Sequence, residues 1–507
     1  MNDIIVGIIT KVSGSKITVS VEDPETVKKV EIFDFSVNYL SVGSLLGVKL
    51  IDGRILVVSI DEIYENNFEK SIIASITGTY DEVLEKYSFG TTSYPLLGEK
   101  VFALKNTMLK NIFASNKEQE ETTIGTYIYD RSIPVSYNPN VLFGKHLGVF
   151  GNTGSGKTCT VVSIIQNYIR NHTNSDIKFI ILDVNGEYRS AFNDDEYEYY
   201  EFSSLRFNHS ILNNVEYGKL FRASEGTQYP ALIECIADLK RSDNPWNMQE
   251  LEKEINGWID KKTLKDKYSN PDTYYKNSLS GYLRTMLLRI ELITSDAELM
   301  NVINSEEGDT LNQIIDSTKK VHILDLQVSL DTLDIVLFLL FKSIYRYKVD
   351  NRKKDKNDSA HLNLVLEEAH RYINADMGET KLGNYYIDKL AREGRKYGIG
   401  LIFSSQVPSM LSYEIVSQCN SVIMHKITSK RDMEFLKGVL RVSNDSFFPQ
   451  MSALEKQFAI VCGEAFSSDT IVRINDACPL PKSNDPVIRE IQESDRGDKG
   501  DDNDIPF

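Results

Sequence analysis

Eight consecutive residues of this 507-residue chain have the types and spacing that bind nucleotide phosphates. Segment 151–158 reads Gly-Asn-Thr-Gly-Ser-Gly-Lys-Thr, which satisfies the pattern Gly-x-x-x-x-Gly-Lys-Thr. Glycines leave backbone N–H groups free to converge on phosphate oxygens. The ammonium of Lys157 can reach the β- and γ-phosphates, and the hydroxyl of Thr158 can ligate Mg²⁺. The segment therefore predicts a nucleoside triphosphatase that uses ATP and Mg²⁺.

The residues on either side of this segment predict the elements that would position it. A short apolar run at 147–150 precedes it, and apolar residues at helical spacing follow it. A strand, a loop and a helix in this order would direct the helix dipole at bound phosphate, which disfavours an incidental glycine-rich turn. The predicted nucleotide contacts are Gly151, Asn152, Thr153, Gly154, Ser155, Gly156, Lys157, Thr158 and Cys159.

Two adjacent carboxylates form the second candidate group. An apolar strand at 361–366 runs directly into Glu367 and Glu368, as in a Walker B motif. Phosphoryl transfer needs neutralised charge and a positioned nucleophile, so Glu367 is predicted to hold Mg²⁺ through water and Glu368 to polarise the attacking water. The alternative, a surface pair at a strand end, is disfavoured by the upstream phosphate loop. His370 is predicted to be a structural side chain.

Further polar residues lie at the ends of predicted strands and helices. Asp183 ends an apolar strand at 178–183, where it would either face a ligand or cap the following turn; the pattern alone favours neither. Gln406 ends the strand at 401–406 and could sense the γ-phosphate or orient water. Arg392 and Arg395 could supply charge to the transition state or stabilise a helix end, and we favour the first role for at least one of them.

The rest of the chain predicts an α/β core with additions at both ends. Residues 1–110 contain short alternating strands and a strong hairpin signal at Asp52-Gly53, which predict a small β-barrel. Residues 111–480 predict the ATPase core, with a mainly helical insertion at about 190–315. Residues 481–507 are polar and acidic, which predicts a weakly ordered tail.

Composition narrows the classes of function. A net charge of −16 argues against a surface coated in basic residues, although it allows a basic pore inside an acidic shell. The five cysteines are scattered without a C-x-x-C pair, which favours reduced thiols over a zinc site.

No apolar run is long enough to span a bilayer and the start lacks signal-peptide features, so we expect a cytoplasmic protein without a membrane anchor. Four lysines favour a solvated helix face over a nucleic-acid contact: Lys261, Lys262, Lys265 and Lys267.

Taken in order, these motifs resemble the HerA family of hexameric DNA-translocating ATPases, in the HerA/FtsK branch of P-loop motors. The shared motifs are the barrel, segment 151–158, Asp-x-x-Gly-Glu-Tyr at 183–188, Leu-Glu-Glu-Ala-His-Arg-Tyr at 366–372, Arg-Glu-Gly-Arg-Lys-Tyr-Gly at 392–398, and Ser405-Gln406. The resemblance implies a RecA-like core whose ATP sites lie between subunits of a homo-hexamer, with double-stranded DNA in the central channel. It implies that the barrel serves assembly and partner docking.

The resemblance also implies roles for individual residues. It assigns Lys157 and Thr158 to nucleotide and Mg²⁺, assigns catalysis to Glu368, and favours a catalytic role for Asp183. Arg392, Arg395 and Gln406 would be transition-state or sensor residues, and Lys145 competes with the arginines for a role across the subunit interface. The glutamate at 367, where most P-loop enzymes have aspartate, matches the family.

Two functions are compatible with this resemblance. The first is an ATP-driven motor that translocates or unwinds duplex DNA together with a NurA-like nuclease. The alternative is an ATP-dependent hexameric scaffold that assembles and activates a Sir2-like or nuclease effector in anti-phage defence. The acidic charge argues only slightly against the motor hypothesis, because each of six subunits needs to contribute only a few contacts to DNA phosphates. A DNA pump for conjugation is disfavoured, because such proteins usually carry transmembrane helices.

Overall fold

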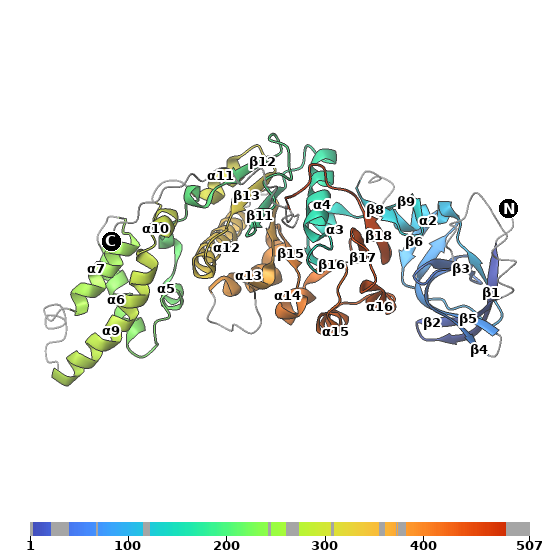
Figure 1. Cartoon of the computed structure of the whole chain (residues 1–507), viewed down its shortest axis with the longest axis horizontal. Helices are drawn as coiled ribbons and strands as arrows, with labels where there is room; N and C mark the ends of the chain where they lie inside the picture. Colours follow the sequence, from blue (N-terminus) through green and yellow to red (C-terminus); the bar gives the residue numbers. More distant parts are fainter. Residues whose placement is uncertain are drawn as a thin grey trace, which may run out of the picture.

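The computed structural model of the chain is elongated, with a barrel at one end and a group of helices at the other (Figure 1). A large mixed sheet lies between these ends and carries the helices that cover its two faces. The structure describes residues 4–21, 40–66, 69–114, 122–241, 245–259, 273–305, 309–353, 360–371, 373 and 382–482. The predicted acidic tail beyond residue 482 and the four lysines at 261–267 lie outside these ranges.

The N-terminal strands form a closed barrel. Six antiparallel strands follow the order β2-β1-β7-β3-β4-β5, and pairing of β2 with β5 closes the ring, with β6 added at the side of β5. The predicted hairpin is confirmed, because Lys49 pairs with Ile55 across a turn in which Gly53 has a φ of 86°. The strands are β1 (Ile5–Ser13), β2 (Lys16–Val21), β3 (Leu45–Lys49), β4 (Ile55–Asn66), β5 (Glu69–Asp81), β6 (Lys86–Phe89) and β7 (Lys100–Ala103).

The central sheet has eleven strands in the order β12-β13-β11-β14-β15-β10-β16-β17-β18-β8-β9. The first seven are mutually parallel and the last four add antiparallel neighbours, which confirms the α/β class. The bounds are β12 (Tyr197–Tyr200), β13 (Val321–Asp325), β11 (Lys178–Asp183), β14 (Leu362–Leu366), β15 (Ile399–Ser405), β10 (His146–Phe150), β16 (Cys419–Met424), β17 (Phe458–Gly463), β18 (Thr470–Ile474), β8 (Thr123–Tyr127) and β9 (Asp130–Ser136).

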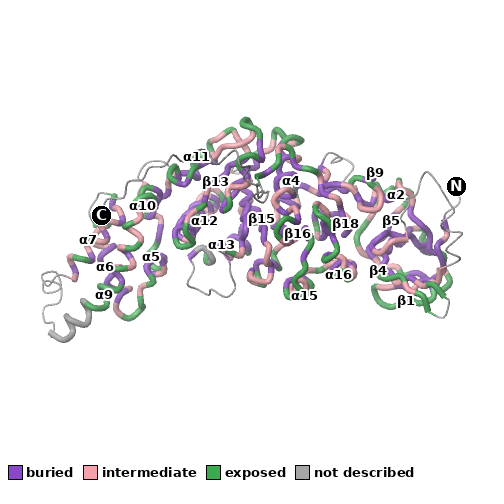
Figure 2. Tube along the Cα trace, viewed as in Figure 1, coloured by how far each residue is buried: buried purple, intermediate pink, exposed green. Residues whose placement is uncertain are grey.

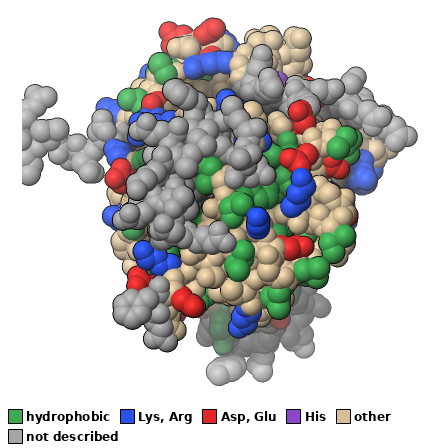
Figure 3. Space-filling model, turned by 90° about the vertical axis from the view of Figure 1, so that its right-hand side faces the viewer, with side chains coloured by type: hydrophobic (Ala, Val, Ile, Leu, Met, Phe, Trp, Pro, Cys, Tyr) green, Lys and Arg blue, Asp and Glu red, His purple; other side chains and the backbone are tan. Residues whose placement is uncertain are grey.

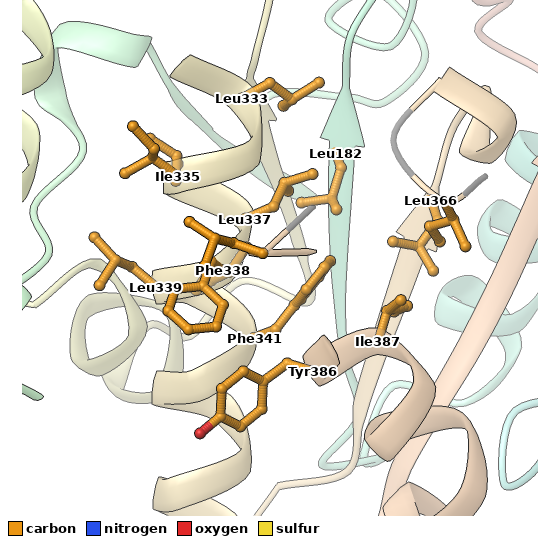
Figure 4. Close-up of a cluster of buried hydrophobic side chains, with 14 of the residues drawn as sticks. Leu182, Leu333, Ile335, Leu337, Phe338, Leu339, Phe341, Leu366, Tyr386 and Ile387 are labelled. Carbon is orange, nitrogen blue, oxygen red and sulfur yellow. The ribbon is translucent and has the colours of Figure 1, made fainter. Parts of the chain in front are cut away.

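Helices cover both faces of this sheet, so its central strands are buried throughout (Figure 2). Strand β11 shows the alternation, because Ile180 and Leu182 join one apolar cluster while Phe179 and Ile181 join the other. On one face, α12 (Leu330–Lys353) packs its apolar side chains toward the sheet and toward α13 (Leu382–Glu393) (Figure 4). On the other face lies α4 (Lys157–Asn171).

The helical group between β12 and β13 is attached to the core by a buried polar network. Lys342 of α12 and Tyr386 of α13 both donate to the carboxylate of Glu216 in α5, the tyrosine hydroxyl at 2.6 Å. Glu216 and Lys342 are both buried, so breaking one partner would leave an unpaired charge inside. The helices are α5 (Asn214–Leu220), α6 (Gln228–Arg241), α7 (Met248–Ile259), α9 (Thr273–Thr294), α10 (Ala297–Ile303) and α11 (Thr310–Asp316).

The barrel is joined to the core through a buried asparagine. The amide of Asn444 lies between α15 (Lys430–Val439) and α16 (Phe447–Met451), and it donates to the Ser59 hydroxyl at 2.9 Å and the Ile60 carbonyl at 3.3 Å. This contact positions strand β4 against the core. The remaining helices are α2 (Asn106–Phe113), α3 (Pro139–Leu142), α14 (Tyr413–Ser417), η1 (Phe202–Ser204), η2 (His209–Ile211), η3 (Ala369–Arg371), η5 (Gly394–Tyr397) and η6 (Pro408–Met410). Within the described ranges, no helix combines the length and the apolar character needed to cross a membrane.

The barrel exposes large apolar side chains on neighbouring loops. Lys49 pairs with Glu82 at 3.9 Å, and Arg54 donates to Ser93 at 3.3 Å, so two hairpin tips and the β6–β7 loop lie side by side. Figure 3, which faces the barrel end, shows apolar side chains interspersed with charged ones. We call this set the barrel-end surface: Ile51, Val83, Leu84, Phe89, Tyr94, Leu96 and Leu97.

Candidate nucleotide site

The phosphate loop lies between the end of β10 and the start of α4, which confirms the predicted strand, loop and helix. Gly154 and Gly156 have φ angles of 70° and 112°, a region that only glycine adopts without strain. A Cβ at Gly151 would lie 2.6 Å from that of His425, so this position also requires glycine. The nine predicted nucleotide contacts are contiguous here, and Cys159 is the third residue of α4.

Lys157 lies buried at the start of α4. Its ammonium donates to the carbonyl of Asn152 at 3.3 Å. Burial lowers the pKa of Lys157, while the nearby Glu368, Glu367 and Glu187 act in the opposite direction. The lysine therefore holds its positive charge opposite three carboxylates, in a loop built to receive phosphate oxygens.

A buried histidine supports the loop from behind. His425 Nδ1 lies 3.1 Å from the Phe458 carbonyl and therefore carries the hydrogen, because a carbonyl only accepts. Its Nε2 then accepts from the Thr160 hydroxyl at 2.9 Å. Burial lowers the pKa of His425 to about 3, so a neutral imidazole connects α4 to β17. Sequence reasoning missed this residue, because a histidine after an apolar strand carries no distinctive signal.

The two Walker B carboxylates have different surroundings. Glu367 is buried, and it accepts from the Tyr188 hydroxyl and from the Ser404 hydroxyl at 3.4 Å. Glu368 has a φ of 47°, which costs a non-glycine residue on the order of 1 kcal/mol. One Glu368 oxygen accepts from the Gln406 amide, and the other lies 3.3 Å from Nδ1 of His370.

Gln406 connects this carboxylate to the phosphate loop. Its amide nitrogen donates to Glu368, and its amide oxygen accepts from the hydroxyl of Thr153. The structure therefore brings Gln406, Glu368 and the loop together at the carboxyl edge of the parallel strands, where open α/β sheets bind ligands. His370 Nδ1 also lies 3.1 Å from the Ser405 hydroxyl, and burial lowers the pKa of its imidazole.

Asp183 lies at the same edge but faces its own turn. One carboxylate oxygen accepts from the backbone N–H groups of Gly186 at 2.8 Å and Glu187 at 3.1 Å, and the other accepts from Tyr188 at 3.0 Å. Burial raises the pKa of Asp183, and these N–H groups oppose the shift. Of the two roles that the sequence pattern left open, this geometry corresponds to the capping of the turn.

Glu187 is the carboxylate that this turn presents to the phosphate loop. Its Oε2 accepts from the hydroxyl of Thr158 at 2.9 Å. Burial raises the pKa of Glu187, while Thr158 and Lys157 oppose that shift. Sequence reasoning gave Glu187 no role, although it stands in the Asp-x-x-Gly-Glu-Tyr motif, four residues after Asp183.

The predicted basic residues lie at the opposite edge of the sheet. Arg392 pairs with Asp388 at 3.0 Å, Arg395 approaches the amide oxygen of Asn420 at 3.4 Å, and Lys145 pairs with Glu464. Lys145 directly precedes the start of β10. Asn420 lies at the start of β16, which pairs with β10 in parallel, so both residues lie at the same edge of the sheet. The phosphate loop leaves the other end of β10, about 15 Å away. The chain therefore does not bring these side chains to its own phosphate loop.

Burial of Glu367 predicts a dependence of stability on pH. Its pKa is raised to about 7 from 4.5, so the folded chain keeps a proton that the unfolded chain releases. The free energy of unfolding should therefore decrease as pH rises from about 4.5 to about 7, by at most on the order of 3 kcal/mol. Glu367→Gln removes this contribution and leaves those of Asp183 and Glu187 in place. In urea unfolding experiments, the free energy of unfolding of Glu367→Gln, minus that of the wild type, should increase as pH rises across this window. Parallel dependences of the two proteins on pH would contradict the assignment.

Comparison with known proteins relates the chain to HerA helicases. A family model described as "Helicase HerA, central domain" matches residues 122–344. The "DNA double-strand break repair helicase HerA" of Saccharolobus solfataricus is 25% identical over 416 residues, covering 80% of this chain and 79% of that protein. The "Probable helicase MJ1565" of Methanocaldococcus jannaschii is 23% identical over 388 residues, covering 75% of this chain and 71% of that protein.

Two solved structures share the fold. VirB4 of Thermoanaerobacter pseudethanolicus has a TM-score of 0.51 at 12% identity, covering 72% of this chain and 98% of that chain. The plasmid coupling protein TrwB, in complex with the non-hydrolysable GTP analogue GDPNP, has a TM-score of 0.50 at 13% identity, covering 78% of this chain and 99% of that chain. These likenesses confirm the RecA-like core. Residues 122–344 match the central domain of HerA helicases, and the chain is similar to HerA proteins along most of its length; its phosphate loop and fold are those of a P-loop ATPase.

Proposed function

We propose that this chain is a subunit of an ATP-hydrolysing ring, a homo-hexamer, that translocates or unwinds double-stranded DNA in its central channel. The observation that carries the proposal is the separation of Lys145, Arg392 and Arg395 from the phosphate loop across the sheet. Basic side chains at that edge can act on a triphosphate only in the site of an adjacent subunit. A ring of such subunits supplies every phosphate loop with a neighbour.

Within one subunit, each of the remaining site residues has a separate role in hydrolysis. Lys157 neutralises the phosphates, and Thr158 binds Mg²⁺, which would neutralise charge on the β- and γ-phosphates. Glu368 polarises the attacking water, because its carboxylate lies beside the phosphate loop and is not used in capping a turn. Gln406 senses the γ-phosphate, since its amide joins Glu368 to Thr153 and must respond when phosphate enters between them. Glu367 lies behind this group, and Asp183 orders the adjoining turn.

The DNA substrate is proposed from the relatives. The protein of Saccharolobus solfataricus is named as a DNA double-strand break repair helicase, and it aligns along 80% of this chain. The net charge of −16 leaves the phosphate contacts to a few basic residues of each subunit, repeated around the ring. A DNA-stimulated ATPase assay tests this part of the proposal, since a motor hydrolyses faster on its track.

The barrel-end surface is proposed as the docking site of a nuclease or effector protein. It gathers large apolar side chains on neighbouring loops, and such groups on a soluble domain typically mark protein interfaces. The partner would be a NurA-like nuclease or a Sir2-like effector. The alternative function, a scaffold that activates such an effector in anti-phage defence, is only slightly favoured by the acidic charge of the chain. The scaffold hypothesis predicts that adding DNA leaves the ATPase activity unchanged.

Mixing two inactive variants tests the composite site. Lys157→Ala and the double variant Arg392→Ala/Arg395→Ala should each hydrolyse ATP at least ~100-fold more slowly than the wild type, because each lacks one half of every site. In mixed rings, an arginine-variant subunit supplies an intact phosphate loop and an adjacent Lys157→Ala subunit supplies intact arginines. Together they form a complete site. Random mixing would complete roughly one site in four, so steady-state ATPase activity should reappear.

The matched control mixes Lys157→Ala with Glu368→Gln. Both substitutions lie at the same edge of the same subunit, so no arrangement in a ring completes a site. This mixture should stay inactive. Equal recovery in both mixtures, or none in the first, would contradict the proposed site between subunits.

A further inference from the structure

The hydroxyl of Thr158, the Mg²⁺ ligand of the phosphate loop, already has a carboxylate partner within the chain. It donates to Oε2 of Glu187 at 2.9 Å. Glu187 is half-buried, and the charge of Lys157 acts on it. A carboxylate at this distance from a cation-binding hydroxyl is placed to share the same cation.

The other acids at this edge are engaged elsewhere. The three turn N–H groups hold both oxygens of Asp183. Glu367 is buried, with Tyr188 bonded to its carboxylate and Ser404 at 3.4 Å. Glu368 is bonded to Gln406. Among the described acids of the site, Glu187 is therefore the one whose carboxylate is bonded to Thr158.

The turn that carries Glu187 is fixed by contacts on several sides. Gly186 has a φ of 73°, which would strain any larger residue, and a Cβ there would have to displace the Gln327 amide, 2.7 Å away. The backbone N–H of Lys482 donates to the Glu187 carbonyl at 2.9 Å, and Ser190 donates to the Leu480 carbonyl at 3.1 Å. Together with the Asp183 cap, these contacts position Glu187 independently of any bound nucleotide.

The chemistry of these donors fits Mg²⁺. A hydroxyl and a carboxylate are hard oxygen ligands, and Mg²⁺ in nucleotide sites takes one or two protein carboxylates together with phosphates and waters. In the part of the chain that the structure describes, no three His, Cys, Asp or Glu side chains are grouped to hold a metal ion. A cation here would therefore need the phosphates of the nucleotide as further ligands.

We propose that Glu187, directly or through one water, is the carboxylate that binds the Mg²⁺ of the nucleotide together with Thr158. This role was expected from the sequence for Glu367. The inference rests on the ATPase activity of the chain and is independent of whether the ring moves DNA. Before nucleotide binds, Glu187 holds the Thr158 hydroxyl in place for the incoming cation.

Mn²⁺ titrations monitored by electron paramagnetic resonance test this assignment, in the presence of a non-hydrolysable ATP analogue. Glu187→Gln keeps an oxygen that can accept from Thr158, so the turn should stay folded while the cation loses a negative ligand. Its Mn²⁺ affinity should fall about tenfold or more. Its affinity for the analogue in EDTA should match the wild type. Asp194→Asn, an exposed acid of the same segment, is the matched control and should bind Mn²⁺ as the wild type does.

Glu367→Gln completes the comparison. Wild-type Mn²⁺ affinity in Glu187→Gln would overturn the proposal, and loss in Glu367→Gln alone would return the role to Glu367. Wild-type protein that binds no analogue, with or without metal, would overturn the nucleotide site itself and not merely the choice of carboxylate. Circular dichroism of each variant separates loss of the ligand from loss of the fold.

Discussion

Replacement of Lys157 by alanine is expected to abolish ATP turnover and to weaken nucleotide binding. The buried ammonium acts on Glu187, Glu367 and Glu368, so its removal takes away the positive charge that compensates these acids where a triphosphate must enter. The uncompensated negative charge adds to the loss of the phosphate contact. We expect turnover to fall at least ~100-fold in steady-state hydrolysis assays, with weaker binding of a fluorescent ATP analogue.

The control for this substitution is Lys110→Ala, which removes an exposed lysine of α2 and should leave hydrolysis unchanged. Lys157→Met adds a second comparison, because it fills the buried space without the charge. It should be as inactive as the alanine variant if the ammonium is the cause. Undiminished turnover in Lys157→Ala would remove the phosphate loop from the reaction.

Glu368→Gln is expected to bind ATP and to hydrolyse it about 10²- to 10⁴-fold more slowly, the usual contribution of a general base. Glutamine has the same length, so its side-chain oxygen can still accept from the Gln406 amide. It cannot take the proton of the attacking water at neutral pH. Single-turnover hydrolysis with preformed ATP complex measures this step without product release.

The same measurement on neighbouring acids locates the base. Near-wild-type hydrolysis in Glu368→Gln would move the role to Glu367 or Asp183. Asp183→Asn is expected to act differently, because its carboxylate holds three backbone N–H groups and their loss would loosen the turn. That variant should therefore lose thermal stability as well as turnover, whereas Glu368→Gln should keep its stability.

The parts of the site that lie in one continuous segment could be predicted from the sequence. The phosphate loop requires glycines at backbone angles that the pattern itself encodes, and the apolar strand and helix beside it are local signals. The Walker B pair is likewise the end of one buried strand. The hairpin at Asp52-Gly53 follows from turn chemistry alone.

The parts that depend on strand order could not be predicted from the residues. The parallel register of β10 and β16 separates Lys145 and Arg395 from the phosphate loop, and no local pattern reports which strands are neighbours. The sequence pattern also leaves the direction of the Asp183 side chain undecided, because a turn cap and a ligand-facing acid share one pattern.

Contacts between segments that are distant in the chain also could not be predicted from the sequence. Glu216, Lys342 and Tyr386 meet in a buried network, although each stands in a different helix and more than 40 residues separate the closest two. His425 supports the phosphate loop through a contact with Thr160, 265 residues earlier in the chain. Such pairs are determined by packing, which no single-segment signal contains.

The left-handed backbone of Glu368 means that stability and turnover favour different residues at this position. Glycine, or asparagine to a lesser degree, adopts a φ of 47° with less strain than glutamate. Selection for a more stable protein alone would therefore replace the carboxylate that we propose polarises the attacking water. A stabilised version of this ATPase has to gain its stability elsewhere, for example at exposed helix positions far from the end of β14.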